Sequence, residues 1–193
     1  MTELVDLPWP PTPIRTARLL LRETEARDRP GFIDLFASND VRRYLGGART
    51  RSELEAAVPE VPGRYVGTFA VQTEDSFIGA VTINRRDPTG PGHVRADGGE
   101  VEVGYTFLPQ FWGRGYATEA VGAALEWVTE VLPGEPVVLC TQSANEPSVR
   151  LAERLGFAEV ERFKEFDAEQ WFGVWTKTAQ ARRPGPSARV VNR

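Results

Sequence analysis

The stretch Gln110-Phe-Trp-Gly-Arg-Gly-Tyr-Ala-Thr-Glu119 joins two segments whose hydrophobic residues follow different periods. In residues 101–107, apolar residues alternate with polar or small ones, which predicts a β-strand with one buried face. From Tyr116 to Val128, apolar residues recur every three or four positions, which predicts a helix with one apolar side. Gly113 and Gly115 lie between the two segments, so we expect a tight turn from the strand into the helix.

Such a turn leaves the first N–H groups of the helix without partners inside the helix, and the helix dipole adds about half a positive charge there. The turn therefore predicts an anion site, and a phosphate is the usual occupant. Two common phosphate motifs fit poorly. A nucleotide P-loop needs a lysine after its last glycine, and this turn has none. A dinucleotide fingerprint needs a third small residue where Thr118 stands, and it opens a parallel sheet rather than following antiparallel strands.

The composition is that of a globular protein with one large domain: 193 residues, of which 41% are hydrophobic and 26% charged. The formal net charge of −4 argues against nucleic acid as a partner. Cys140 is the only cysteine, which excludes a disulfide framework and a thiolate metal site and indicates a reducing compartment. There is no signal peptide and no apolar run of about 18 residues. We therefore expect a cytoplasmic protein with no metal and no membrane partner.

The remaining pattern predicts one folded domain, residues 15–177, between a proline-rich N-terminal arm, residues 1–14, and a disordered tail, residues 178–193. Within the domain we expect a strand, two helices, three strands, a helix, a strand, a helix and two strands. Ser52 and Glu55 have the spacing of a capping box at the second helix. Three consecutive antiparallel strands followed by a crossover predict the α+β class with a mixed sheet.

Several motifs in the expected order resemble those of the GNAT acetyltransferases. Gln110-x-x-Gly113-x-Gly115 is similar to the signature whose backbone amides hold the pyrophosphate of acetyl-coenzyme A in that superfamily. Four further motifs resemble those of the branch that includes the ribosomal-protein N-terminal acetyltransferases: Thr16-x-Arg18, Glu102-Val-Gly-Tyr105, Asn145-x-x-Ser148 and Leu155-Gly-Phe157. The resemblance implies the GNAT fold: a central, mostly antiparallel sheet of about seven strands, splayed between the fourth and fifth and flanked by about four helices.

The resemblance also implies an N-acetyltransferase, with acetyl-coenzyme A as acyl donor and a primary amine as acceptor. The acceptor would be a protein N-terminus or a small molecule, and the enzyme a monomer or a homodimer. Pantetheine would pair with the main chain of Phe107 and Leu108 at the end of the central strand, and residues 111–117 would supply the donors to the pyrophosphate. The residues implied for this binding are Phe107, Leu108, Gln110, Phe111, Trp112, Gly113, Arg114, Gly115, Tyr116, Ala117, Asn145 and Ser148. For Arg114, a solvated side chain stays open as the alternative.

The expected reaction is the attack of a neutral amine on a thioester carbonyl. An α-amine with a pKa of about 8 is roughly a tenth neutral at pH 7, whereas a lysine amine with a pKa of about 10.4 is less than about a thousandth neutral. An α-amine acceptor therefore needs only a weak base, such as a carboxylate acting through a water. Glu102 is the first candidate, and Glu100, on the same strand face, is the second. A solvated carboxylate and a cross-strand salt bridge stay open for both.

Asn145 and Ser148 lie around the start of a predicted short helix. By resemblance, Asn145 hydrogen-bonds the pantetheine arm and Ser148 protonates the departing thiolate. Tyrosines often take this donor role in the family, so the identity of the donating hydroxyl is open. Capping of the helix is the alternative for both residues.

Other reactive or aromatic residues are expected to have structural roles. His93 lies in a Gly- and Pro-rich loop and is expected to be solvated, and Cys140 is expected to pack in the core. Trp171 and Phe172 are candidates for a wall of the acceptor pocket. The alternative to an enzyme is a non-catalytic acyl-coenzyme A-binding module, which would keep the phosphate turn without needing a base.

Overall fold

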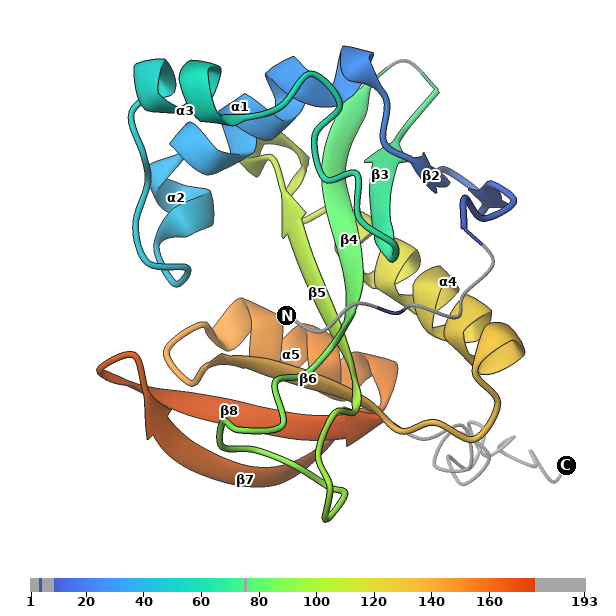
Figure 1. Ribbon diagram of the computed structural model, residues 1–193, viewed down its shortest axis with the longest axis vertical. Helices are drawn as coiled ribbons and strands as arrows, with labels where there is room; N and C mark the ends of the chain where they lie inside the picture. Colours follow the sequence, from blue (N-terminus) through green and yellow to red (C-terminus); the bar gives the residue numbers. More distant parts are fainter. Residues whose placement is uncertain (1–3, 5–8, 75, 176–193) are drawn as a thin grey trace, which may run out of the picture.

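A single eight-stranded sheet with helices on both faces organises the computed structural model, which describes residues 4, 9–74 and 76–175 (Figure 1). The strands lie in the order β1-β2-β3-β4-β5-β6-β8-β7. Their bounds are β1 Ile14–Arg15, β2 Leu20–Glu23, β3 Thr68–Gln72, β4 Phe77–Arg85, β5 Val101–Phe107, β6 Val137–Gln142, β7 Ala158–Glu165 and β8 Ala168–Trp175. The helices are α1 Arg29–Ala37, α2 Asn39–Arg42, α3 Arg51–Ala57, α4 Tyr116–Val131 and α5 Glu146–Leu155, with 3-10 turns η1 Ala26–Asp28 and η2 Pro109–Phe111.

The sheet is antiparallel except where β5 and β6 run side by side in parallel, joined by the crossover helix α4. These two strands pair only at Val101–Val137 and Glu102–Val138. Figure 1 shows them together at their beginnings and apart towards their ends, with the α2 region beyond the gap. The mixed class and the splayed sheet expected from the sequence are therefore confirmed. The extra strand and the extra helix are β1 and α2, which are both short.

The two faces of the sheet carry different helices. The main core lies between the sheet and helices α4 and α5, and it contains Val103 and Phe107 of β5 with Ala120, Val121 and Val128 of α4, all nearly inaccessible to solvent. Because side chains alternate along a strand, the even-numbered residues of β5 face the side of α1, α2 and α3. Among the described residues, no helix is both long and apolar enough to cross a membrane.

One detail at the edge of the domain differs from the sequence-based expectation. The cap of α3 is Thr50, whose hydroxyl accepts from the N–H of Glu53 while the Glu53 carboxylate accepts from the N–H of Thr50, so the expected Ser52–Glu55 capping box is wrong. In the N-terminal segment, the ring of Trp9 lies edge-on to Phe69 with centroids 5.2 Å apart. The expected tail, residues 178–193, lies outside the described residues, and the boundaries of the domain stay a prediction.

Candidate active site

The gap between β5 and β6 exposes unpaired main chain. In the antiparallel pair of β4 and β5, Leu108 N–H donates to the Ile78 carbonyl at 2.9 Å, so the even-numbered residues of β5 hydrogen-bond to β4. The main-chain groups of Val103, Tyr105 and Phe107 therefore point towards the gap, where β6 has diverged.

This register changes the expected roles of Phe107 and Leu108. The Leu108 N–H is already used, and its side chain packs with Leu35 and Val41. The Phe107 carbonyl accepts a hydrogen bond from Trp112 Nε1 at 2.7 Å, which leaves its N–H facing the gap. The main-chain groups available to an added strand are consequently mainly those of Val103 and Tyr105. They lie earlier along β5 than the expected Phe107 and Leu108.

A cavity of about 740 Å³ fills the gap and reaches from the Gly113–Gly115 turn to the α2 region. Its volume is typical of a site for a drug-sized ligand or cofactor. Leu108, Gln110 and Arg114 are not among its lining residues: Leu108 is buried, and the other two side chains are exposed. The other implied binding residues all line this cavity, namely Phe107, Phe111, Trp112, Gly113, Gly115, Tyr116, Ala117, Asn145 and Ser148.

The turn at the N-terminus of α4 presents open main-chain donors to this cavity. Gly113 and Gly115 have φ values of +73° and +79°, in the left-handed region that glycine adopts without strain. Among the described residues, no protein acceptor bonds to the N–H groups of residues 113–118. The N–H groups of Phe111 and Trp112 donate instead to the carbonyls of Leu108 and Pro109 in the η2 turn. The open donors therefore begin at Gly113 rather than at Phe111.

The motif Thr16-x-Arg18 fixes this turn from the N-terminal side. Thr16 Oγ1 donates to Glu119 Oε1 at 2.6 Å, and Arg18 Nη2 lies 2.6 Å from Glu119 Oε2. Arg18 Nη1 also donates to the Arg114 carbonyl at 2.9 Å, and its guanidinium lies over the ring of Tyr116. The first turn of α4 and the glycine turn are thereby held to the segment before β2.

Two hydroxyls meet on the wall of the cavity. The Oη of Tyr105, on β5, lies 2.7 Å from the Oγ of Ser148, in the first turn of α5. Burial raises the pKa of Tyr105, and the hydrogen bond with Ser148 offsets part of that effect, so the phenol keeps its proton at neutral pH. The sequence placed Ser148 here and missed Tyr105, because Tyr105 falls on the buried side of an alternating strand.

Asn145 does not cap α5 with its side chain. Its Nδ2 donates to Thr141 Oγ1 at 3.3 Å, and no side-chain hydrogen bond closes the first turn of the helix. Among the described residues, no donor reaches the Asn145 side-chain carbonyl oxygen, and the residue lines the cavity. Its amide is therefore available to a ligand.

Glu102 lies where β5 and β6 separate, on the sheet face opposite Tyr105. Its Oε1 accepts from Arg86 Nη1 at 2.7 Å, and 28% of its side chain is exposed. The expected alternative of an ion pair is thus present, with a partner in the loop after β4. Burial raises the pKa of Glu102, and the opposing charge of Arg86 does not cancel this effect. Glu102 is not among the residues that line the cavity, but its chain neighbours Val103 and Gly104 are, and a carboxylate with a raised pKa is suited to accept a proton.

Comparison with known proteins decides the family. Residues 18–158 match the model of the acetyltransferase (GNAT) domain. The chain belongs to the GNAT acetyltransferases. It is therefore an acyltransferase, as the resemblance of its motifs implied.

Individual relatives and solved structures are consistent with this membership. The chain is 28% identical over 154 residues to the uncharacterized N-acetyltransferase YnaD of Bacillus subtilis, covering 78% of this chain and 85% of YnaD. A GNAT-family acetyltransferase structure from Bacillus anthracis superposes with a TM-score of 0.69 at 21% identity, covering 85% of this chain and 98% of that one. The ribosomal L7/L12 α-N-protein acetyltransferase RimL, solved with coenzyme A, superposes with a TM-score of 0.64 at 14% identity, covering 85% and 97%.

Glu100, the second candidate base, has a structural role in this GNAT domain. It is fully buried, and it accepts hydrogen bonds of 2.7 Å from His93 Nδ1 and from the N–H groups of Val94 and Arg95. Burial alone would raise the pKa of Glu100, but these hydrogen bonds outweigh it and lower the pKa from 4.5 to about 2. Glu100 is thus a poor base, and the expectation that His93 is solvated is wrong.

Three further expectations concern residues near the cavity. Cys140 is only partly buried and lines the cavity, so it is not a core residue. Trp171 and Phe172 are fully buried and line neither side of the gap, so they do not form a wall of an acceptor pocket. Trp171 donates to Glu159, and Phe172 lies under the Arg86 guanidinium at 5.1 Å. Trp171 thus links β8 to β7, and Phe172 packs against Arg86, the ion-pair partner of Glu102.

Proposed function

We propose that this GNAT domain transfers the acetyl group of acetyl-coenzyme A to a primary amine by direct attack within a ternary complex. The observation that carries the proposal is the row of open N–H groups at residues 113–118, beside a splayed strand and a cavity of about 740 Å³. Main-chain donors at the start of a helix favour a diphosphate, because they combine direct hydrogen bonds with the helix dipole.

The chain's residues fit the rest of coenzyme A. The open main chain of Val103 and Tyr105 can pair with the two amides of a pantetheine arm, as in the addition of a strand to a sheet edge. Asn145 offers an unused side-chain carbonyl on the opposite wall of the cavity. When bound, acetyl-coenzyme A supplies the acetyl thioester and the thiolate leaving group.

Glu102 is the proposed general base. An α-amine has a pKa of about 8 and a carboxylate ordinarily about 4.3, so a raised carboxylate pKa narrows the difference that proton transfer must overcome. Arg86 holds one oxygen of Glu102, and the other makes no hydrogen bond among the described residues. Glu102 would accept the amine proton directly or through one water and leave the amine lone pair free to attack.

Tyr105 and Ser148 are the proposed proton donors to the departing thiolate. Both hydroxyls line the cavity, and the hydrogen bond between them lets either one pass on a proton. A covalent route through Cys140 is disfavoured, because burial raises the pKa of its thiol to about 11 and keeps it protonated. Direct transfer from the thioester to the amine needs no enzyme nucleophile.

The test combines binding with turnover. We expect calorimetry to detect coenzyme A binding, and we expect thiol release from acetyl-coenzyme A to depend on an added primary amine. A panel of short peptides with free N-termini and of small amines would then separate the two acceptor classes. Binding without turnover on any amine would instead favour the non-catalytic acyl-coenzyme A-binding module, and absence of binding would contradict both functions.

A further inference from the structure

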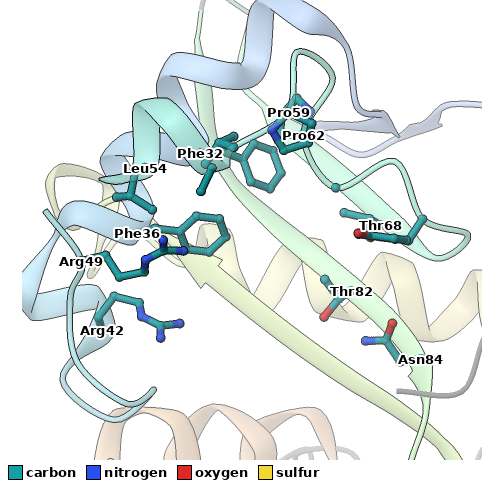
Figure 2. A pocket seen from close by; sticks show the side chains of 14 residues that line it. Phe32, Phe36, Arg42, Arg49, Leu54, Pro59, Pro62, Thr68, Thr82 and Asn84 are labelled. Atoms are coloured by element: carbon teal, nitrogen blue, oxygen red, sulfur yellow. The ribbon is translucent and has the colours of Figure 1, made fainter. Parts of the chain in front are cut away.

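A second cavity, of about 460 Å³, lies between β4 and helices α1 and α3, on the sheet face that carries Glu102 (Figure 2). Phe32, Phe36 and Leu54 give it an apolar wall, and Thr82 and Asn84 of β4 stand across from them. This mixture of apolar wall and few polar groups is typical of a site for a small molecule.

The charge in this cavity is unbalanced. Arg42 and Arg49 both line it, and Figure 2 shows both side chains on the same side of the cavity, with Arg49 above Arg42. The lining contains no carboxylate, and among the described residues no carboxylate forms an ion pair with either arginine, although Arg49 is close enough to Glu53 on α3 for its charge to help lower the pKa of that carboxyl. Arg42 Nε donates to a main-chain carbonyl, that of Gly47, at 3.0 Å. Burial lowers the pKa of Arg42, and the nearby charge of Arg49 lowers it further.

Two buried arginines elsewhere in the chain show what is missing here. Arg22 is paired with Asp28 through two hydrogen bonds of 2.8 Å, and Arg86 is paired with Glu102 at 2.7 Å. Arg42 is partly buried and Arg49 is exposed, and an arginine without a carboxylate partner keeps unused donors in a fork that matches an anionic oxygen pair. The Arg42–Arg49 pair therefore fits an anion from outside the chain.

Two strand residues of this cavity pair with the part of β5 that carries the proposed base. Asn84 is the strand partner of Glu102, and Thr82 is the partner of Gly104, so both lie next to β5 on the face of Glu102. Gly104 also lines the larger cavity, and a Cβ there would lie 2.7 Å from Thr82 Oγ1. A side chain at Gly104 would therefore clash with Thr82, which lines the second cavity.

We propose that the second cavity binds the body of the acceptor, and that the acceptor is an amine joined through an apolar group to a carboxylate held by Arg42 and Arg49. This inference rests on the proposed acetyl transfer, with the amine at Glu102. Two arginines can bind a carboxylate with paired, charge-assisted hydrogen bonds, while the aromatic wall accepts the apolar group. The carboxylate has two sources, a free small acid or an acidic side chain close to a peptide N-terminus.

The experiment compares matched acceptors. The small-molecule pair is 4-(aminomethyl)benzoate and 4-(aminomethyl)benzamide, and the peptide pair is Ala-Phe-Glu-amide and Ala-Phe-Gln-amide. We expect kcat/KM to favour the acid by about 10-fold or more within one pair, which is the usual size of a charged hydrogen bond. Preference in the first pair identifies a free acid as the source, and preference in the second identifies an acidic peptide.

Substitutions of the two arginines test whether they cause the preference for the acid. Arg42→Gln and Arg49→Gln are expected to raise KM for the preferred acid by about 10-fold and to leave KM for its amide within about twofold. Arg64→Gln is the matched control, because Arg64 is exposed in the neighbouring loop and does not line the cavity. Equal kcat/KM within both pairs, or an equal loss in Arg64→Gln, would overturn the assignment while acetyl transfer itself stands. Coenzyme A binding without turnover of any amine would overturn both.

Discussion

The phenol of Tyr105 and the hydroxyl of Ser148 lie 2.7 Å apart, although they come from the central strand β5 and from helix α5 on opposite sides of the splayed gap. This contact joins the two walls of the cavity at the place where a thiolate would leave. Because β5 and β6 do not pair beyond Glu102 and Val138, this contact links β5 to the helix that follows β6.

A double-mutant cycle on Tyr105 and Ser148 tests their joint role. We expect Tyr105→Phe and Ser148→Ala each to lower kcat by about 10-fold, less than the 10²-fold or more that general acids often supply, because a thiol with a pKa of about 8.5 leaves readily. The double variant should lose little more than the worse single variant, since the hydroxyls act as one unit. Fully multiplicative losses would contradict a shared role. Unchanged coenzyme A affinity by calorimetry is the control.

The pH profile of Glu102→Gln tests the proposed base. Wild-type kcat/KM should fall on the acidic side as Glu102 is protonated, and its raised pKa places this limb above the usual carboxylate range. We expect the Glu102→Gln substitution to lower the plateau by about 10²-fold and to abolish that limb, while the limb of the amine substrate near pH 8 stays. Glutamine keeps an acceptor for Arg86, so the loop should stay in place. A profile identical to wild type would exclude Glu102.

Gly115→Glu tests the phosphate turn. A carboxylate beside the open N–H groups would occupy their positive potential and repel a diphosphate, and like charges in contact cost several kcal/mol. We expect coenzyme A affinity to fall by about 10²-fold or more. Gly134→Glu is the matched control, because Gly134 also has a left-handed φ, +86°, but lies outside the cavity. The control should share the cost in thermal stability and keep coenzyme A affinity. Equal binding losses in both variants would remove the turn from the site.

The elements that sequence predicted well are those in which one period or one residue type decides the structure. Helix α4 keeps a single apolar face over its length, and α5 is closed by Gly156, whose φ of +96° lies in the left-handed region that glycine favours. Helix α2 was missed because Asn39–Arg42 is too short to show a period. The capping box of α3 was misplaced because Thr50–Glu53 and Ser52–Glu55 have identical spacing, and only the observed start of the helix separates them.

Within the site, local motifs were predictable and long-range partners were not. The open donors of the turn follow from consecutive residues, whereas the contact of Tyr105 with Ser148 spans 43 positions. The alternation of side chains along the strand could not show which of Glu100 and Glu102 is the better base, because it places both on the same face. Their roles differ because Glu100 meets three donors from its own loop, whereas Glu102 meets one from Arg86.

Glu100→Gln should destabilise the protein in a pH-dependent way. The folded-state pKa of Glu100 is about 2 against an ordinary 4.5, a difference worth about 3 kcal/mol. Because the folded pKa is depressed, this stability is present above about pH 5 and is lost as the pH falls towards 2. Urea unfolding should therefore show a difference of about 3 kcal/mol between wild type and variant at pH 7 that shrinks steadily below pH 5. Asp97→Asn, in the same loop but with 74% of its side chain exposed, should change stability by less than about 1 kcal/mol. A pH-independent difference for Glu100→Gln would mean that packing, rather than the charge, stabilises the loop.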